Sequence, residues 1–418
     1  MSTSEYDSYR PPELDRGRKK RRRGGRPGSG PGGNGGAGRG GGGGGGGQGW
    51  KNRGADGNRE MPMVEDVEFS SYYGRSIVKA PPWGDEIALY LFLGGLAGGS
   101  SLLGLGAQFS DRPQLRIATR LTAITATGVG GAALVADLGR PERFLNMMRV
   151  FKVSSPMSLG TWILSGFGVG SGILAAIEVD RLTGLRLPLG PLRRILHAVE
   201  TPAALESALF ATPLAAYTGA LLGDTAVPTW NAAGRNGLSY VFVSSAAVAA
   251  GGAAMALAPV RETGPARLLA LTGAAGEAVA MGRMKKGMHP AEVEPLEEGE
   301  PGHKLHRAEK LLIAGAIGTA VAEVGARVFA KKLGQNSGTG SGLAGAGRRS
   351  WKTRAALRTL SVVSGAALAA ASAYTRFGVL EAGIESTKDP RHVVEPQRAR
   401  LEERRARGIV DDSITTGV

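Results

Sequence analysis

Eight long apolar segments constrain this chain of 418 residues more than any other feature of its sequence. An α-helix needs about twenty predominantly apolar residues to cross the hydrocarbon core of a bilayer. Within lipid every backbone polar group needs an internal partner, which a helix provides from its own segment. The pattern therefore predicts an all-α integral membrane protein with eight transmembrane helices. The expected spans are residues 87–109, 115–137, 158–179, 201–223, 238–258, 264–282, 308–330 and 355–377.

Small residues are placed in these segments so that helices can pack closely. Gly94 and Gly98 are four residues apart, and so are Gly166 and Gly170. This spacing puts glycines on one face of a helix, where the backbone of a neighbouring helix can approach. We interpret the glycine pairs as close packing within a bundle, with dimerisation and cofactor approach as the alternatives.

The first part of the chain has a different character. Residues 1–81 contain the basic run 18–23 and the unbroken glycine run 40–47. This composition cannot bury enough apolar surface to offset the entropy lost on ordering, so we expect a disordered tail. We expect no signal peptide, because the tail lacks an apolar core. The predicted domains are the tail at 1–81, a membrane domain at 82–380 and a charged C-terminal tail at 381–418.

The formal net charge of +15 lies largely in this tail and in the connections between apolar segments. Basic segments beside transmembrane helices bind anionic lipid and set topology. We therefore predict membrane lipid, and not nucleic acid, as the partner of these charges. The basic run in the tail favours cytoplasmic termini, whereas the Lys and Arg content of the short loops favours the opposite orientation.

The sequence contains no cysteine and five histidines. The protein therefore forms no disulfide, binds no thiolate-ligated iron–sulfur cluster and has no cysteine nucleophile. Only His197 lies near the start of an apolar segment, so the sequence offers no pair of axial haem ligands inside the bundle. We expect a polypeptide without haem, iron–sulfur cluster or other redox metal of its own.

A dense polar motif follows the second apolar segment, in the connection to the third. It spans residues 137–144 and reads DLGRPERF. Its acidic and basic side chains fall at the expected membrane surface, where a carboxylate beside arginines can relay protons. Two interpretations stay open. The motif is a salt-bridge cluster that locks a tight turn, or it is a polar wall at a ligand pocket or an electron-donating partner.

Ionisable residues inside apolar segments are costly to hold in lipid, so each is a candidate functional residue. Glu323 and Arg327 lie one helical turn apart and can form an ion pair, which is either structural or part of a proton path. Glu206 and Glu277 have no partner visible in the sequence. An unpaired carboxyl in an apolar helix can stay neutral and serve in a proton relay.

Three aromatic residues and one acidic residue are the remaining candidate functional residues. A tyrosine hydroxyl inside an apolar helix normally finds an acceptor, so Tyr217 bonds either a backbone carbonyl or a bound ligand. Tyr90 and Trp162 are candidates for the same role, with packing or interfacial anchoring as the simpler interpretation. Glu86 lies at the start of the first apolar segment.

Several of these segments resemble the NrfD/polysulfide-reductase membrane-subunit family, and the resemblance spans roughly residues 82–395. The residues that carry it are Trp83-Gly84, 87–95, the DLGRPERF motif at 137–144, 155–158 with Trp162, 217–219 and 224–230. The resemblance implies eight helices arranged as two four-helix bundles, with a quinol site near one membrane face. It also implies a ferredoxin-like iron–sulfur partner subunit and a molybdopterin oxidoreductase subunit.

We therefore expect a multi-pass protein of the cell (plasma) membrane that is non-catalytic alone. Its expected role is to exchange electrons and protons between quinone, specifically menaquinone, and the iron–sulfur partner. Two alternatives remain: a proton-translocating subunit without quinone chemistry, and a plain membrane anchor for a redox complex.

The resemblance also assigns residue roles. The quinone-binding tyrosine of the family corresponds to Tyr217, and the acid and arginines of the loop correspond to Asp137, Arg140 and Arg143. The polar contact from the first helix of the family has no counterpart beyond Glu86 and Tyr90. The predicted site comprises Asp137, Glu206 and Glu323 for proton transfer, with Tyr217, Arg140, Arg143, Tyr90, Trp162 and Glu86 for quinone binding.

Overall fold

The computed structural model describes residues 76–138, 141–336 and 343–409, with the side chains of residues 143 and 329–350 left undescribed. Within these ranges all regular secondary structure is helical. Almost all of the predicted disordered tail, residues 1–81, lies outside the described residues, so its disorder and the predicted domain boundaries stay predictions.

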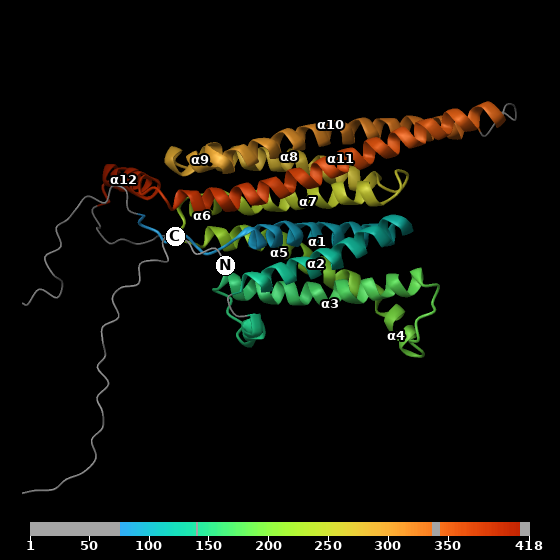
Figure 1. The fold of residues 1–418 in the computed structure, drawn as a ribbon, viewed down its shortest axis with the longest axis horizontal. Helices are drawn as coiled ribbons and strands as arrows, with labels where there is room; N and C mark the ends of the chain where they lie inside the picture. The colour runs from blue at the N-terminus through green and yellow to red at the C-terminus, as the bar shows by residue number, and fades with distance from the viewer. Residues whose placement is uncertain (1–75, 139–140, 337–342, 410–418) are drawn as a thin grey trace, which may run out of the picture. The chain divides into compact units, whose positions relative to one another are not determined.

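Long helices form the body of the membrane domain (Figure 1). Every apolar segment expected from the sequence coincides with or lies within one of them. The eight long helices described are α1 (Asp85–Phe109), α2 (Pro113–Asp137), α3 (Pro156–Leu182), α5 (Glu200–Gly223), α7 (Leu238–Leu257), α8 (Gly264–Gly287), α10 (Gly299–Asn336) and α11 (Leu343–Ser386).

Among the described residues, six helices are long and apolar enough to cross a membrane. The remaining two long helices, α2 and α8, are not among them. Polar and charged side chains interrupt both, including Arg116 and Arg120 in α2 and Arg267 and Glu277 in α8. The six apolar helices identify the protein as an integral membrane protein. That all eight long helices cross the membrane stays a prediction. The six are α1, α3, α5, α7 and the segments Gly299–Val328 of α10 and Trp351–Ser386 of α11.

Short helices occupy the connections. The 3-10 helix η2 (Pro141–Arg149) follows α2, and α4 (Leu192–Ala198) links α3 to α5. Three further helices lie near the end of the domain where α1 begins (Figure 1). These are α6 (Pro228–Arg235), α9 (Pro290–Glu297) and α12 (Arg391–Ala406).

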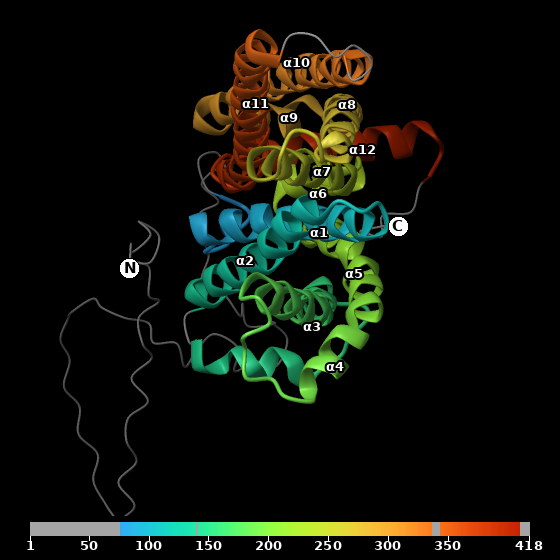
Figure 2. The ribbon, with the colours of Figure 1, turned by 90° about the vertical axis from the view of Figure 1, so that its right-hand side faces the viewer.

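The long helices pack in two sets, seen end-on in Figure 2. α1, α2, α3 and α5 contact mainly one another, and α7, α8, α10 and α11 do the same. However, α1 packs extensively against α7 as well as α5. The two sets thus share one interior, and a division into two four-helix bundles stays a prediction.

Glycines of α1 make this shared interior possible. A Cβ atom added at Gly98 would lie 2.6 Å from the carbonyl oxygen of Ala211 in α5. One added at Gly99 would lie 2.6 Å from the Cβ of Ala250 in α7. The two glycines therefore bring α1 into backbone contact with one helix of each set, which supports close packing as the reason for the glycine pattern.

We predict that Gly98→Ala destabilises the protein and that Gly94→Ala does not. The added methyl group at position 98 meets the α5 backbone, which cannot move aside as a flexible side chain could, so we expect a loss of about 1–3 kcal/mol. Gly94 is one turn earlier on the same helix and has no atom within 4 Å of an added Cβ. The free energy of unfolding in mixed micelles measures both, and equal losses would contradict the packing account.

Candidate functional site

Asp137 and Glu86 meet where α2 ends and α1 begins. The half-buried Asp137 side chain lies near the backbone N–H of Gly84 and near the Glu86 carboxylate. Gly84 is the residue that precedes the first turn of α1, and Glu86 is exposed in that turn. The free N–H groups at a helix start attract negative charge. The fold thus places two carboxylates at one helix N-terminus.

Two predicted tyrosines lie close to this end. Tyr90 follows Glu86 by one turn of α1 and is 4% exposed. It belongs to an apolar cluster against which half-buried Tyr217 of α5 also packs, together with Leu134 of α2 and Leu164 of α3. Four helices thus contribute to the surroundings of the two aromatic rings.

Gly160 of α3 explains how Tyr217 reaches this position. A Cβ added at Gly160 would lie only 2.2 Å from Cε2 of Tyr217. Only a residue without a side chain leaves room for the ring at this point of α3. The packing therefore fixes the Tyr217 ring between α5 and α3.

A stacked pair of tryptophans packs in the same apolar cluster. Trp83, which precedes α1, stacks on Trp230 of α6 with ring centroids 5.4 Å apart. Trp230 is fully buried, and its Nε1 donates a hydrogen bond to the carbonyl oxygen of Val379 in α11 at 2.8 Å. These contacts tie the start of α1 to the second set of helices.

Trp162 has a different neighbourhood. Its ring is 39% exposed and meets Phe151 edge to face, with centroids 6.0 Å apart. Its Nε1 donates to the carbonyl oxygen of Val150 at 3.4 Å. Trp162 therefore anchors the α2–α3 connection to α3. In that connection Arg140 and the side chain of Arg143 lie outside the described parts of the structure, so their roles stay predictions.

Glu206 lies deeper along α5, eleven residues before Tyr217. At 1.5 Å per residue this is about 16 Å along the helix axis. Its Oε2 is buried, has no hydrogen-bond partner among the described residues, and occupies the space where a Cβ of Gly170 would be, 1.8 Å away. Leu214 and Phe167 belong to an apolar cluster that lies between the levels of Glu206 and Tyr217. The structure thus separates Glu206 from the tyrosines.

Glu323 forms the ion pair that its spacing from Arg327 predicts, at 2.6 Å. It also accepts a hydrogen bond from Arg267 of α8. Arg267 in turn donates to the Thr263 hydroxyl at 2.7 Å, just before α8. This group lies near the α8 N-terminus, at the opposite end of the helices from Asp137. Sequence reasoning missed Arg267 because no local spacing relates it to Glu323.

A second buried ion-pair network was also missed. Arg120 of α2 is 2% exposed and donates to Glu178 of α3 at 2.6 Å and to Glu200 of α5 at 2.7 Å. Glu178 also accepts from Arg116 at 2.8 Å, and Glu200 accepts from Arg181 at 2.5 Å. The network joins three helices at the end opposite to Asp137. The one available signal was a pair of arginines four residues apart at the start of an apolar segment.

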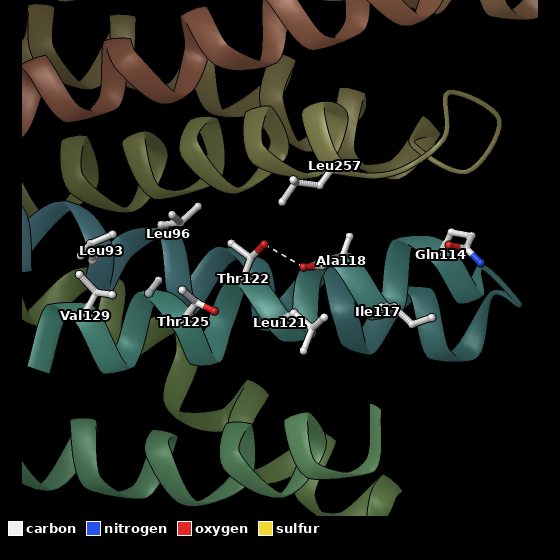
Figure 3. A pocket seen from close by; sticks show the side chains of 11 residues that line it. Leu93, Leu96, Gln114, Ile117, Ala118, Leu121, Thr122, Thr125, Val129 and Leu257 are labelled. Atoms are coloured by element: carbon white, nitrogen blue, oxygen red, sulfur yellow. Dashed lines mark hydrogen bonds between the residues drawn. The ribbon is translucent and has the colours of Figure 1, made fainter. Parts of the chain in front are cut away.

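An apolar cavity of about 520 Å³, open to the outside over much of its length, runs along α1 and α2 (Figure 3). Leu93 and Val129 lie at one end of it, and Ile117 lies near the other. The hydroxyl of Thr122 on its wall donates to a carbonyl of its own helix at 2.8 Å, which leaves the wall largely apolar. The sequence analysis placed candidate ligand contacts at the end of the second apolar segment and at Tyr217 in the fourth. This cavity touches α2, and no residue of α5 lines it.

Tyr90 does not line the cavity, but it lies near the Leu93 end of it. A Cβ added at Gly130 would lie 3.3 Å from the Cβ of Leu93 and 3.7 Å from Cδ2 of Tyr90. Tyr90 is therefore about one helical turn from the Leu93 end of the cavity. Among the residues that the structure describes, no group of three acidic or histidine side chains is arranged to hold a metal ion. The side chains near the tyrosines are thus hydroxyls and carboxylates within apolar walls, which fits a carbonyl-bearing lipophilic ligand.

We predict that Arg120→Gln strongly destabilises the protein. It removes the main counter-charge of Glu178, whose side chain is fully buried, and breaking a buried ion pair from one side costs about 3–5 kcal/mol. Arg327→Gln is the matched control, because Arg327 is 79% exposed and an exposed pair contributes at most about 1 kcal/mol. Unfolding in mixed micelles compares the two, and similar losses would show that the Arg120 network contributes little.

Comparison with known proteins gives two matches. The family model described as polysulphide reductase, NrfD, matches residues 76–267, from before α1 to the start of α8. The C subunit of polysulfide reductase from Wolinella succinogenes is 31% identical over 149 residues, which are 34% of this protein and 47% of that subunit. The matched part thus spans about half the length of this curated relative. Together the two matches support the NrfD family for this part of the protein.

Proposed function

We propose that this protein is the quinone-interacting membrane subunit of a redox complex in the cell membrane. One observation carries the proposal: Tyr90 and Tyr217, from two different helices, pack on one apolar cluster beside the carboxylates of Asp137 and Glu86. The relative described above is named as one component of polysulfide reductase. That name supports assembly of the present protein with other subunits.

The residues present suit a quinone. Its ring offers two carbonyl oxygens that need hydrogen-bond donors, and its isoprenoid tail needs apolar surroundings. The hydroxyls of Tyr90 and Tyr217 are donors within apolar walls. The cavity of about 520 Å³ beside Tyr90 has the size of a small-molecule site. When bound, a quinone, in our proposal menaquinone, would supply the reversible uptake of electrons and protons.

The residues of the protein would bind, orient and supply protons. Tyr217, fixed by Gly160, and Tyr90 would donate hydrogen bonds that orient the ring. Asp137 is half-buried at the end of α2, which is expected to lie at the membrane surface. There it would hold a proton between the site and the aqueous phase. Arg140 and Arg143 follow Asp137 in the same motif and would stabilise its charged form.

The other predicted residues would support the site without contacting the quinone ring. Glu86 extends the acidic end of the site to the surface, and Trp162 holds the α2–α3 connection that carries the arginines. Glu206 would act only as a deeper proton acceptor in the first set of helices. The two arginines bonded to Glu323 favour the structural interpretation of that residue.

The partner would carry the metal centres. The present protein has no cysteine, so thiolate-bound clusters must belong to another subunit. A ferredoxin-like iron–sulfur subunit, joined to a molybdopterin oxidoreductase, would exchange electrons with the quinone at the end of the helices where Asp137 lies. The isolated protein would then have no complete activity, and the complex would be the enzyme.

We predict that Tyr217→Phe and Asp137→Asn reduce the quinone that co-purifies with the protein. Loss of one hydrogen bond to a bound ligand costs about 1 kcal/mol or more, which is close to a tenfold loss of affinity. Tyr240→Phe is the matched control, because Tyr240 of α7 is 75% exposed. Lipid extraction and quantification of quinone per protein measure the effect, with a direct titration of a quinone analogue.

The outcomes separate the proposal from its rivals. Full quinone content and unchanged quinone-linked turnover in both variants would favour a plain membrane anchor. Proton translocation that persists in quinone-free proteoliposomes would favour a translocating subunit without quinone chemistry.

A further inference from the structure

Arg376 of α11 is a fully buried cation held by three other helices. Its Nη2 donates to the carbonyl oxygen of Phe242 in α7 at 2.6 Å, and the guanidinium lies 3.8 Å from the centre of the Phe242 ring. Its Nη1 donates to the hydroxyl of Thr218 in α5 at 3.4 Å. A Cβ at Gly95 of α1 would lie 3.0 Å from Nη2. Such a cation is retained only with a compensating charge nearby.

Glu277 of α8 supplies that charge. It is 3% exposed and lies near Arg376, without an ion pair within 4 Å between the two side chains. Its Oε1 accepts a hydrogen bond from the hydroxyl of Thr375 at 2.8 Å. The neighbouring helix α7 adds the hydroxyl of Ser245, which lies near Glu277 and donates to the hydroxyl of Ser372 at 2.9 Å. Thus a carboxylate, a guanidinium and four hydroxyls, that of Thr218 included, form one buried polar cluster.

Two atoms of this cluster have no partner. Oε2 of Glu277 and Nε of Arg376 are buried without a hydrogen bond among the described residues. A buried carboxylate oxygen without a donor is costly, and such groups are normally satisfied by water or by a proton. The free Oε2 is therefore a place where a proton can be held.

The cluster adjoins the proposed quinone site. Thr218, which contacts Arg376, directly follows Tyr217 in α5. Phe377, which directly follows Arg376, packs on the apolar cluster that contains Tyr90. The Glu277 cluster thus lies on the α8 side of the two tyrosines, in the second set of helices.

We propose that Glu277, positioned by Thr375 and balanced by Arg376, is a buried proton-exchanging carboxyl that serves the quinone site through Thr218. This inference rests on the proposed function. When a proton is released at the tyrosines, one O–H bond forms at Oε2 of Glu277; when a proton is needed there, the same bond breaks. No electron passes through the carboxyl, because the electrons go to or come from the iron–sulfur partner. Arg376 stays charged and limits the cost of the unprotonated state.

The test uses the whole complex in proteoliposomes with menaquinone. Redox-induced infrared difference spectra detect the carbonyl stretch of a protonated carboxyl group, identified by its shift in D₂O. We expect this band in the native protein, its loss in Glu277→Gln and a shifted band in Thr375→Val. We also expect Glu277→Gln to lower quinone-linked turnover by about 10²-fold or more, the usual contribution of a proton-transferring group, while bound quinone stays unchanged.

Glu381→Gln is the matched control. Glu381 lies on α11, as Arg376 does, but its partner is Lys304 and it is outside the cluster. This variant is expected to keep the band and the turnover. An unchanged band and turnover in Glu277→Gln would overturn the inference and make Glu277 a structural counter-ion.

Two features keep the test decisive. If Glu277→Gln does not fold, Thr375→Val decides, because it keeps the carboxyl and removes only its donor; an unshifted band with unchanged turnover overturns the inference. Failure of the proposed function has a separate signature, which is a native protein that retains no quinone. A native protein that retains quinone while Glu277→Gln keeps the band refutes only the role of Glu277.

Discussion

The close approach of α1 to α5 and α7 is the constraint on which the other features depend. Lipid offers little hydrophobic drive between helices, so tight contact requires small residues at the interface. Gly98 and Gly99 allow that contact toward α5 and α7. Because α1 is held there, Tyr90 shares an apolar cluster with Tyr217, and Gly95 leaves room for the guanidinium of Arg376. The tyrosines and the Glu277 cluster are therefore products of one packing arrangement.

The two ends of the membrane domain differ in how their charged side chains are paired. Arg120 with Glu178, and Arg267 with Glu323, join helices at the end opposite to Asp137. Glu178 and Glu323 each accept hydrogen bonds from at least two arginines. Near the tyrosines Glu277 has fewer partners: its Oε1 accepts from the Thr375 hydroxyl, and its Oε2 has no partner among the described residues. Incomplete pairing in a membrane interior is costly and is typical of functional positions.

The sequence predicted the helices well because length and hydropathy are local properties. All eight expected segments are helical, and the Glu323–Arg327 pair was found from its spacing within one helix. Contacts between distant segments could not be predicted from the sequence. Arg267, Arg120 and Arg376 are bonded to residues 56 to 158 positions away, and no local pattern reports such distances. For the same reason the sequence grouped Glu206 with Asp137, although the structure separates Glu206 from the tyrosines near Asp137.

Photoaffinity labelling tests the central claim most directly, namely that a quinone binds beside Tyr90 of α1 and Tyr217 of α5. The intact complex is irradiated with a menaquinone analogue that carries a photoreactive group on its ring, and labelled peptides are identified by mass spectrometry. The account predicts labels on the α1 peptide around Tyr90 and the α5 peptide around Tyr217, suppressed by excess unlabelled menaquinone. Saturable labelling confined to α10 or α11, or labelling that menaquinone does not suppress, would contradict it.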